Sequence, residues 1–191
     1  ADFAGACAMR CLIQLGSAVG TLLLLCVLRD AVGFERLFPG RTSEDGLMVM
    51  VLVYTVGVVI GALVSGSISD RSGRRRRNVL AASALMALAA VLLALWPTWA
   101  MALAGAAVLG LGFGGYIAVE QALVSQVLPT ATARGKDLGI LNIANSAPQV
   151  LGPAVAAVLV TQLGGYPALY LATAAVTIGG SLLVLKVRSV A

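Results

Sequence analysis

Charged residues are confined to a few short segments of this 191-residue chain, and long apolar runs separate those segments. Four runs contain no charged residue at all: residues 11–28, 46–69, 78–119 and 138–185. A helix needs about 20 apolar residues to cross the hydrocarbon core of a bilayer, so each of the last two runs is long enough for two spans. The pattern therefore predicts an all-α membrane protein.

Helix-breaking residues interrupt each of the two longest runs near its middle. Trp96-Pro97-Thr98-Trp99 divides the first, and Gly164-Gly165-Tyr166-Pro167 divides the second. Proline and paired glycines end helices and favour tight turns. The breaks predict a single bundle of six transmembrane helices over residues 1–191, near residues 6–29, 46–69, 78–96, 99–127, 138–162 and 167–186.

The composition agrees with a membrane protein and excludes several kinds of chemistry. Hydrophobic residues make up 60% of the chain and charged residues 11%, whereas a soluble domain carries about 25% charge. There is no histidine, which excludes histidine triads and histidine metal sites. Cys7, Cys11 and Cys26 lack a metal or redox spacing, and we interpret them as small core residues. We expect no metal, no cofactor and no enzymatic activity.

The positions of the basic residues predict the orientation of the helices. Ten of the 13 fall on one side of the predicted membrane: Arg10, Arg71, Arg74, Arg75, Arg76, Arg77, Arg134, Lys136, Lys186 and Arg188. By the positive-inside rule, we expect a multi-pass protein of the cytoplasmic (inner or plasma) membrane with both termini in the cytoplasm. We interpret residues 74–77 as a loop that faces the lipid bilayer rather than nucleic acid. Four aromatic residues are then expected at the outer interface: Trp96, Trp99, Tyr166 and Tyr170.

The loop after the second expected helix contains a recognisable motif, Gly66-Ser67-Ile68-Ser69-Asp70-Arg71-Ser72-Gly73-Arg74-Arg75. Asp70 lies at a helix C-terminus, where the helix dipole disfavours a negative charge, so we expect it to have a compensating partner. The segment resembles the Gly-x-x-x-Asp-Arg-x-Gly-Arg-Arg signature of the major facilitator superfamily. The alternative is a basic loop that only sets topology. The resemblance implies a conformational switch formed by Gly66, Asp70, Arg71, Gly73, Arg74 and Arg75.

A second segment, residues 127–153, resembles the loop and helix that precede the last helix in the second half of bacterial transporters of this superfamily. The two resemblances together imply half of a transporter, the carboxyl-terminal half, built from two inverted three-helix repeats. The expected helices show no residue-level repeat. Since family members usually have twelve helices, the implied partner is a missing second six-helix half or a self-associated copy.

Polar residues inside the predicted spans gather on single helix faces. On the first expected helix, Arg10, Gln14, Ser17 and Thr21 lie within an arc of roughly 60°. On the fifth, Asn142, Asn145, Ser146 and Gln149 lie within roughly 100°. The family resemblance places helices one and four at a central cavity, flanked by helices two and five, with helices three and six facing outward, so the stripes are candidates for a substrate pathway. The alternative is hydrogen bonding between helices, at about 0.6 kcal/mol per contact.

The fourth expected helix contributes Tyr116 and Glu120, one turn apart, and Glu120 is the only carboxylate well inside a predicted span. Arg10 and Glu120 should both lie within roughly 6–11 Å of the inner helix ends. An isolated charge costs about 2.5–3.5 kcal/mol at the membrane centre. We therefore hypothesise that the two pair, directly or through water. The alternative for Arg10 is that it extends to the lipid headgroups.

These features together favour secondary active transport of a small solute by alternating access. We expect coupling to a proton or another cation through Glu120. The general likeness of the fourth and fifth expected helices to those of family members favours a sugar or small metabolite over drug efflux. The competing interpretation is a non-transporting six-helix membrane scaffold or a homodimerising half-transporter.

Overall fold

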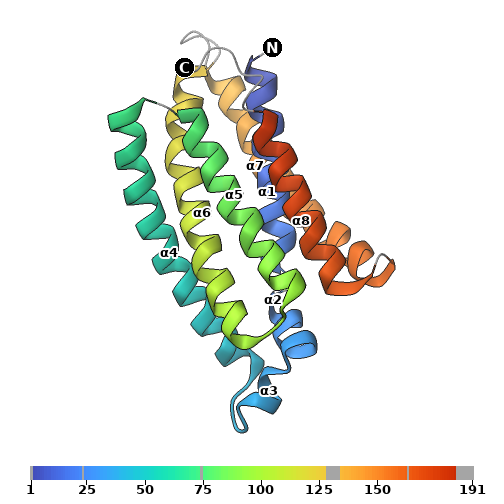
Figure 1. The fold of residues 1–191 in the computed structure, drawn as a ribbon. Helices are drawn as coiled ribbons and strands as arrows, with labels where there is room; N and C mark the ends of the chain where they lie inside the picture. Colours follow the sequence, from blue (N-terminus) through green and yellow to red (C-terminus); the bar gives the residue numbers. More distant parts are fainter. Residues whose placement is uncertain (1, 23, 74, 128–133, 163, 184–191) are drawn as a thin grey trace.

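The computed structural model arranges long helices side by side in one bundle (Figure 1). It describes residues 2–22, 24–73, 75–127, 134–162 and 164–183. Within these ranges the chain is helical, without strands, and its long helices are α1 (Asp2–Leu22), α4 (Ser43–Ser72), α5 (Arg75–Leu95), α6 (Trp99–Val127), α7 (Arg134–Gln162) and α8 (Gly165–Leu182). The predicted all-α membrane fold is confirmed.

Five helical stretches of the described residues are long and apolar enough to cross a membrane: Cys7–Val32, Ser43–Ser72, Arg75–Leu95, Trp99–Glu120 and Asn142–Gln162. The sixth long helix, α8, has 18 described residues. The α4–α5 connection and the start of α1 lie at the same end of the bundle (Figure 1). We call this the basic end, after Arg71 and Arg75.

Local sequence signals explain where the helices begin and end. The N-cap Thr42 and Asp45 form a capping box at the start of α4, in which each side chain accepts a hydrogen bond from the other residue's backbone N–H. Gly73, with φ of 66°, ends this helix. Gly164, with φ of 111°, is the N-cap of α8, and Gly165, with φ of 76°, is its first residue.

The first expected helix has a more complex course than its apolar pattern indicates. After α1 come the short α2 (Leu24–Cys26), a π-helix (Val27–Val32) and α3 (Phe34–Leu37). Gly33, with φ of 65°, separates the π-helix from α3. Residues 24–32 contain no proline or glycine, so nothing local predicts the wider turn there.

Helix packing divides the bundle into two groups of three. Helices α4 and α5 pack on α6, while α7 and α8 pack on α1. The groups meet mainly where α5 packs on α8, and α1 and α6 touch at few points. Each central helix thus packs on the second and third helices of the other three-helix segment. This exchange is the pattern of two interlocked inverted repeats, which no residue-level similarity reveals.

Glycines allow α4 and α6 to approach at backbone distance. A Cβ added at Gly61 would overlap the Leu111 carbonyl oxygen, and one at Gly114 would overlap the Val58 carbonyl oxygen. Gly57 and Gly110 face each other one turn earlier in each helix. Small residues four apart on both helices are a common way to pack helices in membranes.

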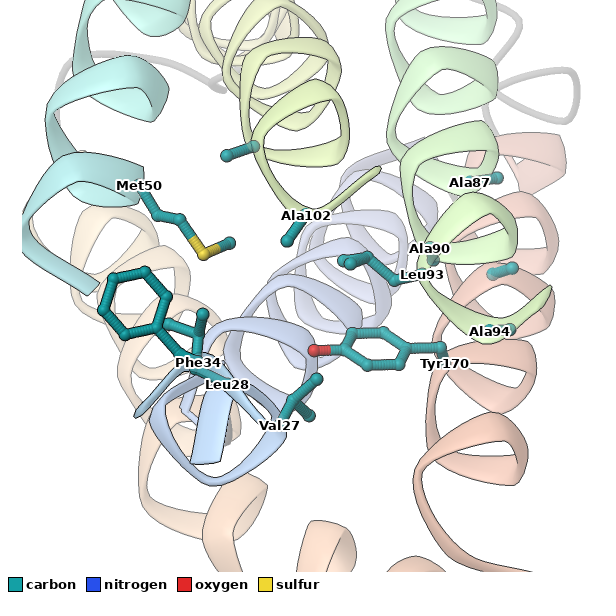
Figure 2. Close-up of a cluster of buried hydrophobic side chains, with 12 residues drawn as sticks. Val27, Leu28, Phe34, Met50, Ala87, Ala90, Leu93, Ala94, Ala102 and Tyr170 are labelled. Carbon is teal, nitrogen blue, oxygen red and sulfur yellow. The ribbon is translucent and has the colours of Figure 1, made fainter. Parts of the chain in front are cut away.

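The largest apolar cluster lies toward the end opposite the basic end. Figure 2 shows Val27 and Leu28 of the π-helix, Phe34 of α3 and Tyr170 of α8 converging there. Tyr170 is only 2% exposed, so it is a core residue and not part of an exposed aromatic belt. Trp99 packs its ring edge-on against Phe34 in the same region.

Candidate functional site

An ion pair joins the two central helices. Arg10 of α1 donates from Nη1 to Oε1 of Glu120 of α6 at 2.8 Å, and the two side chains are 15% and 3% exposed. The expected pairing is therefore confirmed, and it is direct. The backbones of α1 and α6 approach closely at few points, so side chains make the contact between these helices, and this bond is its polar part.

Apolar side chains surround the ion pair. Tyr116, one turn before Glu120, packs with Met9 and Ile13 of α1 and with Val79 of α5. Its hydroxyl is buried and has no hydrogen-bond partner among the described residues. Tyr116 thus lies in the core beside the charges, and it is not among the residues that line the internal cavity described below. The low polarity around Glu120 makes its charge depend strongly on Arg10.

The second polar contact links α1 to α7. Gln14 donates from Nε2 to Oδ1 of Asn145, which joins the polar stripes of the first and fifth expected helices. The other residues of the α7 stripe, Asn142, Ser146 and Gln149, are exposed. One member of this stripe therefore holds α1, while the others remain on the open side of α7.

An internal cavity of about 270 Å³ lies between the two groups of helices. Ser17 and Thr21, the last two members of the α1 stripe, line it. The other hydroxyl groups in its wall come from Tyr54 of α4 and from Tyr170, Thr173 and Thr177 of α8. The α1 stripe is thus divided among three environments: an ion pair, an amide contact and a cavity.

The sequence interpretation missed the contribution of α8. The family resemblance places the sixth helix at the outside, yet Tyr170, Thr173 and Thr177 face the interior. Their spacing of three and four residues was the available signal, since it places all three on one helix face.

The expected switch motif lies at the basic end. Asp70 and Arg71 are exposed in the last turn of α4, Gly73 ends that helix, and Arg75 begins α5. Arg74 lies outside the described residues. A Cβ added at Gly66 would meet Ala118 of α6 at ordinary van der Waals distance. Among the described residues, Asp70 has no ion pair or hydrogen bond, so the structure supplies no compensating partner within them.

The described ranges contain no group of three or more Cys, Asp or Glu residues that could hold a metal ion. The polar groups that the described residues bring together are the Arg10–Glu120 ion pair, the Gln14–Asn145 amide contact and the hydroxyl groups of the cavity wall.

Comparison with known proteins identifies the family. Residues 6–191 match the profile of the Major Facilitator Superfamily. The chain belongs to this superfamily. Its relatives and fold are those of transporters and not of enzymes, so the prediction that the chain is not an enzyme is confirmed. The chain is an integral multi-pass membrane protein of this family.

Several known transport and drug-resistance proteins resemble the chain over part of its length. The multidrug resistance protein Stp of Mycobacterium tuberculosis is 30% identical over 122 residues, which are 64% of this chain and 22% of Stp. The probable metabolite transport protein CsbC of Bacillus subtilis is 36% identical over 104 residues, 54% of this chain and 22% of CsbC. The glucose transporter GlcP of Staphylococcus epidermidis is 32% identical, with the same coverage of both chains.

A solved structure supports the fold. The human organic anion transporter MFSD10 (TETRAN) superposes with a TM-score of 0.72 at 19% sequence identity. The match covers 97% of this chain and 46% of MFSD10. The chain therefore spans less than half the length of a protein that shares its fold, and its size is that of one half of the family fold.

Proposed function

We propose that this chain is one half of a secondary transporter, which moves a small solute by alternating access and couples that movement to a proton or another cation. The family of this chain and the names of its relatives support transport of a small molecule. Those names include a sugar, a metabolite and multidrug resistance, so they do not select one class of solute.

The buried ion pair is the observation that carries the coupling proposal. Glu120 is almost fully buried, and among the described residues its ion-pair partner is Arg10. A cation or proton that neutralises Glu120 releases Arg10, which is close enough to the basic end to extend toward the headgroups. The other contacts between α1 and α6 are apolar, such as those of Met9 and Ile13 with Tyr116, so loss of this bond weakens the link between the two helices. The charge state of Glu120 is thereby linked to the spacing of α1 and α6.

A second six-helix unit completes the proposed transporter. It is either the other half of the fold or a copy of this chain. Support comes from α4 and α7, which are the least buried of the five candidate membrane spans and carry most of the large exposed apolar residues. We propose that Asp70 at the end of α4 contacts this second unit and acts in the conformational switch, as the family motif implies.

The orientation follows the basic residues. We propose that the basic end faces the cytoplasm, with both termini on that side. Cysteines substituted at Arg75 should then react with a membrane-impermeant maleimide only from the cytoplasm, whereas one substituted at Gly40 should react from outside. The reverse pattern contradicts the orientation.

The coupling proposal is tested with Glu120→Gln in the intact transporter, in membrane vesicles with an imposed pH or sodium gradient. The solutes are labelled glucose, labelled myo-inositol and ethidium. We expect gradient-driven accumulation to fall at least tenfold, while exchange of solute across the membrane without a gradient persists. Glu44→Gln is the matched control, because Glu44 is exposed at the opposite end. Accumulation equal to wild type in Glu120→Gln contradicts the proposal.

A further inference from the structure

We propose that a surface hollow beside the start of α4 binds the headgroup of one phospholipid, in which Arg41 contacts the phosphate and Asp45 contacts a primary ammonium group. Phosphatidylethanolamine carries both groups. This inference goes beyond the proposed transport function, because the ligand is a component of the membrane and not the transported solute.

The hollow combines two opposite charges with apolar side chains. Its volume is about 290 Å³, and it is lined by Phe34, Phe38, Arg41, Asp45, Val49 and Trp99. The three aromatic rings pack on one another, with centroids 4.8–6.0 Å apart. The aromatic part is therefore a continuous apolar wall, and polar recognition in the hollow depends on Arg41 and Asp45.

Both charged side chains are available to a ligand. Among the described residues neither makes an ion pair, although they line the same hollow. One carboxylate oxygen of Asp45 accepts the Thr42 backbone N–H at 3.0 Å, which fixes the side chain and leaves it capacity for about three further hydrogen bonds. A guanidinium group binds phosphate oxygens through a planar pair of N–H groups. A headgroup with a phosphate and an ammonium group therefore matches both charges.

The hollow lies at the depth of lipid headgroups. The candidate membrane spans of α4 and α6 begin at Ser43 and Trp99, and residues of the hollow stand at both starting points. The start of α4 is at the end of the bundle opposite the basic end (Figure 1). Aromatic residues at this level are typical of a membrane–water interface. The bilayer itself therefore presents phosphate and ammonium groups to the hollow.

An apolar stripe continues from the hollow along α4. Its residues are 46–65% exposed and lie within an arc of roughly 80°: Val49, Leu52, Val56 and Val59. The stripe extends over about 15 Å, half of the hydrocarbon thickness, and so matches the acyl chains of one leaflet. The other side of the helix packs on α6 through Gly57 and Gly61. Met48 and Val51, exposed on the adjoining face, remain for the second unit proposed above.

Trp99 provides a local reporter of lipid binding. Trp96→Phe leaves Trp99 as the only tryptophan of the chain. The full chain with this substitution, in detergent micelles, is titrated with phosphatidylethanolamine brominated on its acyl chains, since bromine quenches tryptophan fluorescence at short range. We expect quenching to saturate at one lipid per chain. The half-saturating concentration should be about fivefold lower than for brominated phosphatidylglycerol, which has a phosphate and no ammonium group.

Matched variants test the two charges. Arg41→Gln should raise the half-saturating concentration of both lipids about fivefold to tenfold, whereas Arg36→Gln, at an exposed position outside the hollow, should not. Asp45→Asn should raise the value for phosphatidylethanolamine about fivefold. Phosphatidylglycerol should bind this variant no more weakly, which shows that it is folded. Glu44→Gln, exposed and outside the hollow, is the control for Asp45.

The opposite results overturn the proposal. Quenching that rises in proportion to both lipids without saturation means that the hollow only meets ordinary surrounding lipid. Equal or tighter binding of phosphatidylglycerol means that Asp45 recognises no ammonium group. A loss in Arg36→Gln as large as in Arg41→Gln assigns the effect to general surface charge. Because none of these readouts requires transport, they can fail while Glu120-dependent accumulation persists, and the reverse also holds.

Discussion

The α4–α6 interface and the α1–α7 interface occupy equivalent places in the two halves of the bundle, yet they are built differently. Helices α4 and α6 meet backbone to backbone through four glycines, Gly57, Gly61, Gly110 and Gly114. Helices α1 and α7 share a less extensive interface that contains the Gln14–Asn145 amide contact. α7 also contains Pro148 and Pro153, each of which removes a backbone hydrogen bond.

The difference indicates which interface is fixed and which can rearrange. Close backbone packing has no alternative geometry nearby, because any shift of one helix drives carbonyl oxygens into the other. An amide pair can exchange its partner for water or another polar group at small cost. We therefore expect α4 and α6 to move as one body, and α7 to be the helix that changes its contacts.

The largest effect on stability is expected at the Arg10–Glu120 ion pair, which joins the two groups of helices. Arg10→Met leaves the buried Glu120 carboxylate unpaired and should lower the free energy of unfolding by about 3–5 kcal/mol. The measurement is unfolding by SDS titration in mixed micelles. The double variant Arg10→Met with Glu120→Gln should recover most of the loss. If the double variant is no more stable than Arg10→Met, loss of the ion pair is not the cause of the lower stability.

The glycine interface should tolerate almost no added volume. Gly114→Ala places a methyl group against the Val58 backbone, and we expect a loss of about 1–3 kcal/mol in the same titration. Gly179→Ala in α8 is the control, since no atom lies within 4 Å of an added Cβ there. Equal stability of the two variants disproves the claim that α4 and α6 are fixed by backbone contact.

The amide interface should respond weakly in stability. Asn145→Leu removes the partner of Gln14, and we expect a loss of about 0.6 kcal/mol, the average for a hydrogen bond between membrane helices. Asn142→Leu, at an exposed position one turn earlier, should change stability even less. A loss from Asn145→Leu as large as that from Gly114→Ala would show that the two interfaces are equally rigid.

The smallest effect on stability is expected at Asp70, because its side chain is exposed at the end of the fixed α4–α6 pair. Asp70→Asn should leave membrane insertion and the unfolding titration unchanged. In the intact transporter the same variant should slow solute uptake, since we propose that Asp70 contacts the second unit. Uptake at the wild-type rate would reduce the motif to a loop that sets topology.

The sequence predicted the parts of this structure that depend on local signals. Uncharged runs and the breaks at Pro97 and Gly164 predicted the helices, and the depths of Arg10 and Glu120 predicted their pairing. The π-helix was not predictable, because no proline or glycine marks residues 24–32. Tyr170 was misinterpreted because an aromatic residue near a helix end is typical of a membrane interface. The cavity depends on the spacing of α1 and α6, which no single segment specifies.

The joined helices α4 and α6 also have a mechanical consequence. Two rods fixed side by side bend far less than either rod alone, so the pair transmits a tilt along its whole length. With 30 residues, α4 is about 45 Å long. A tilt of about 5° at the far end therefore displaces its tip, which carries Asp70, by roughly 4 Å, a simple lever calculation from the helix rise. That displacement exceeds the length of a hydrogen bond, so a small rotation at one membrane surface is enough to make or break a contact at the other.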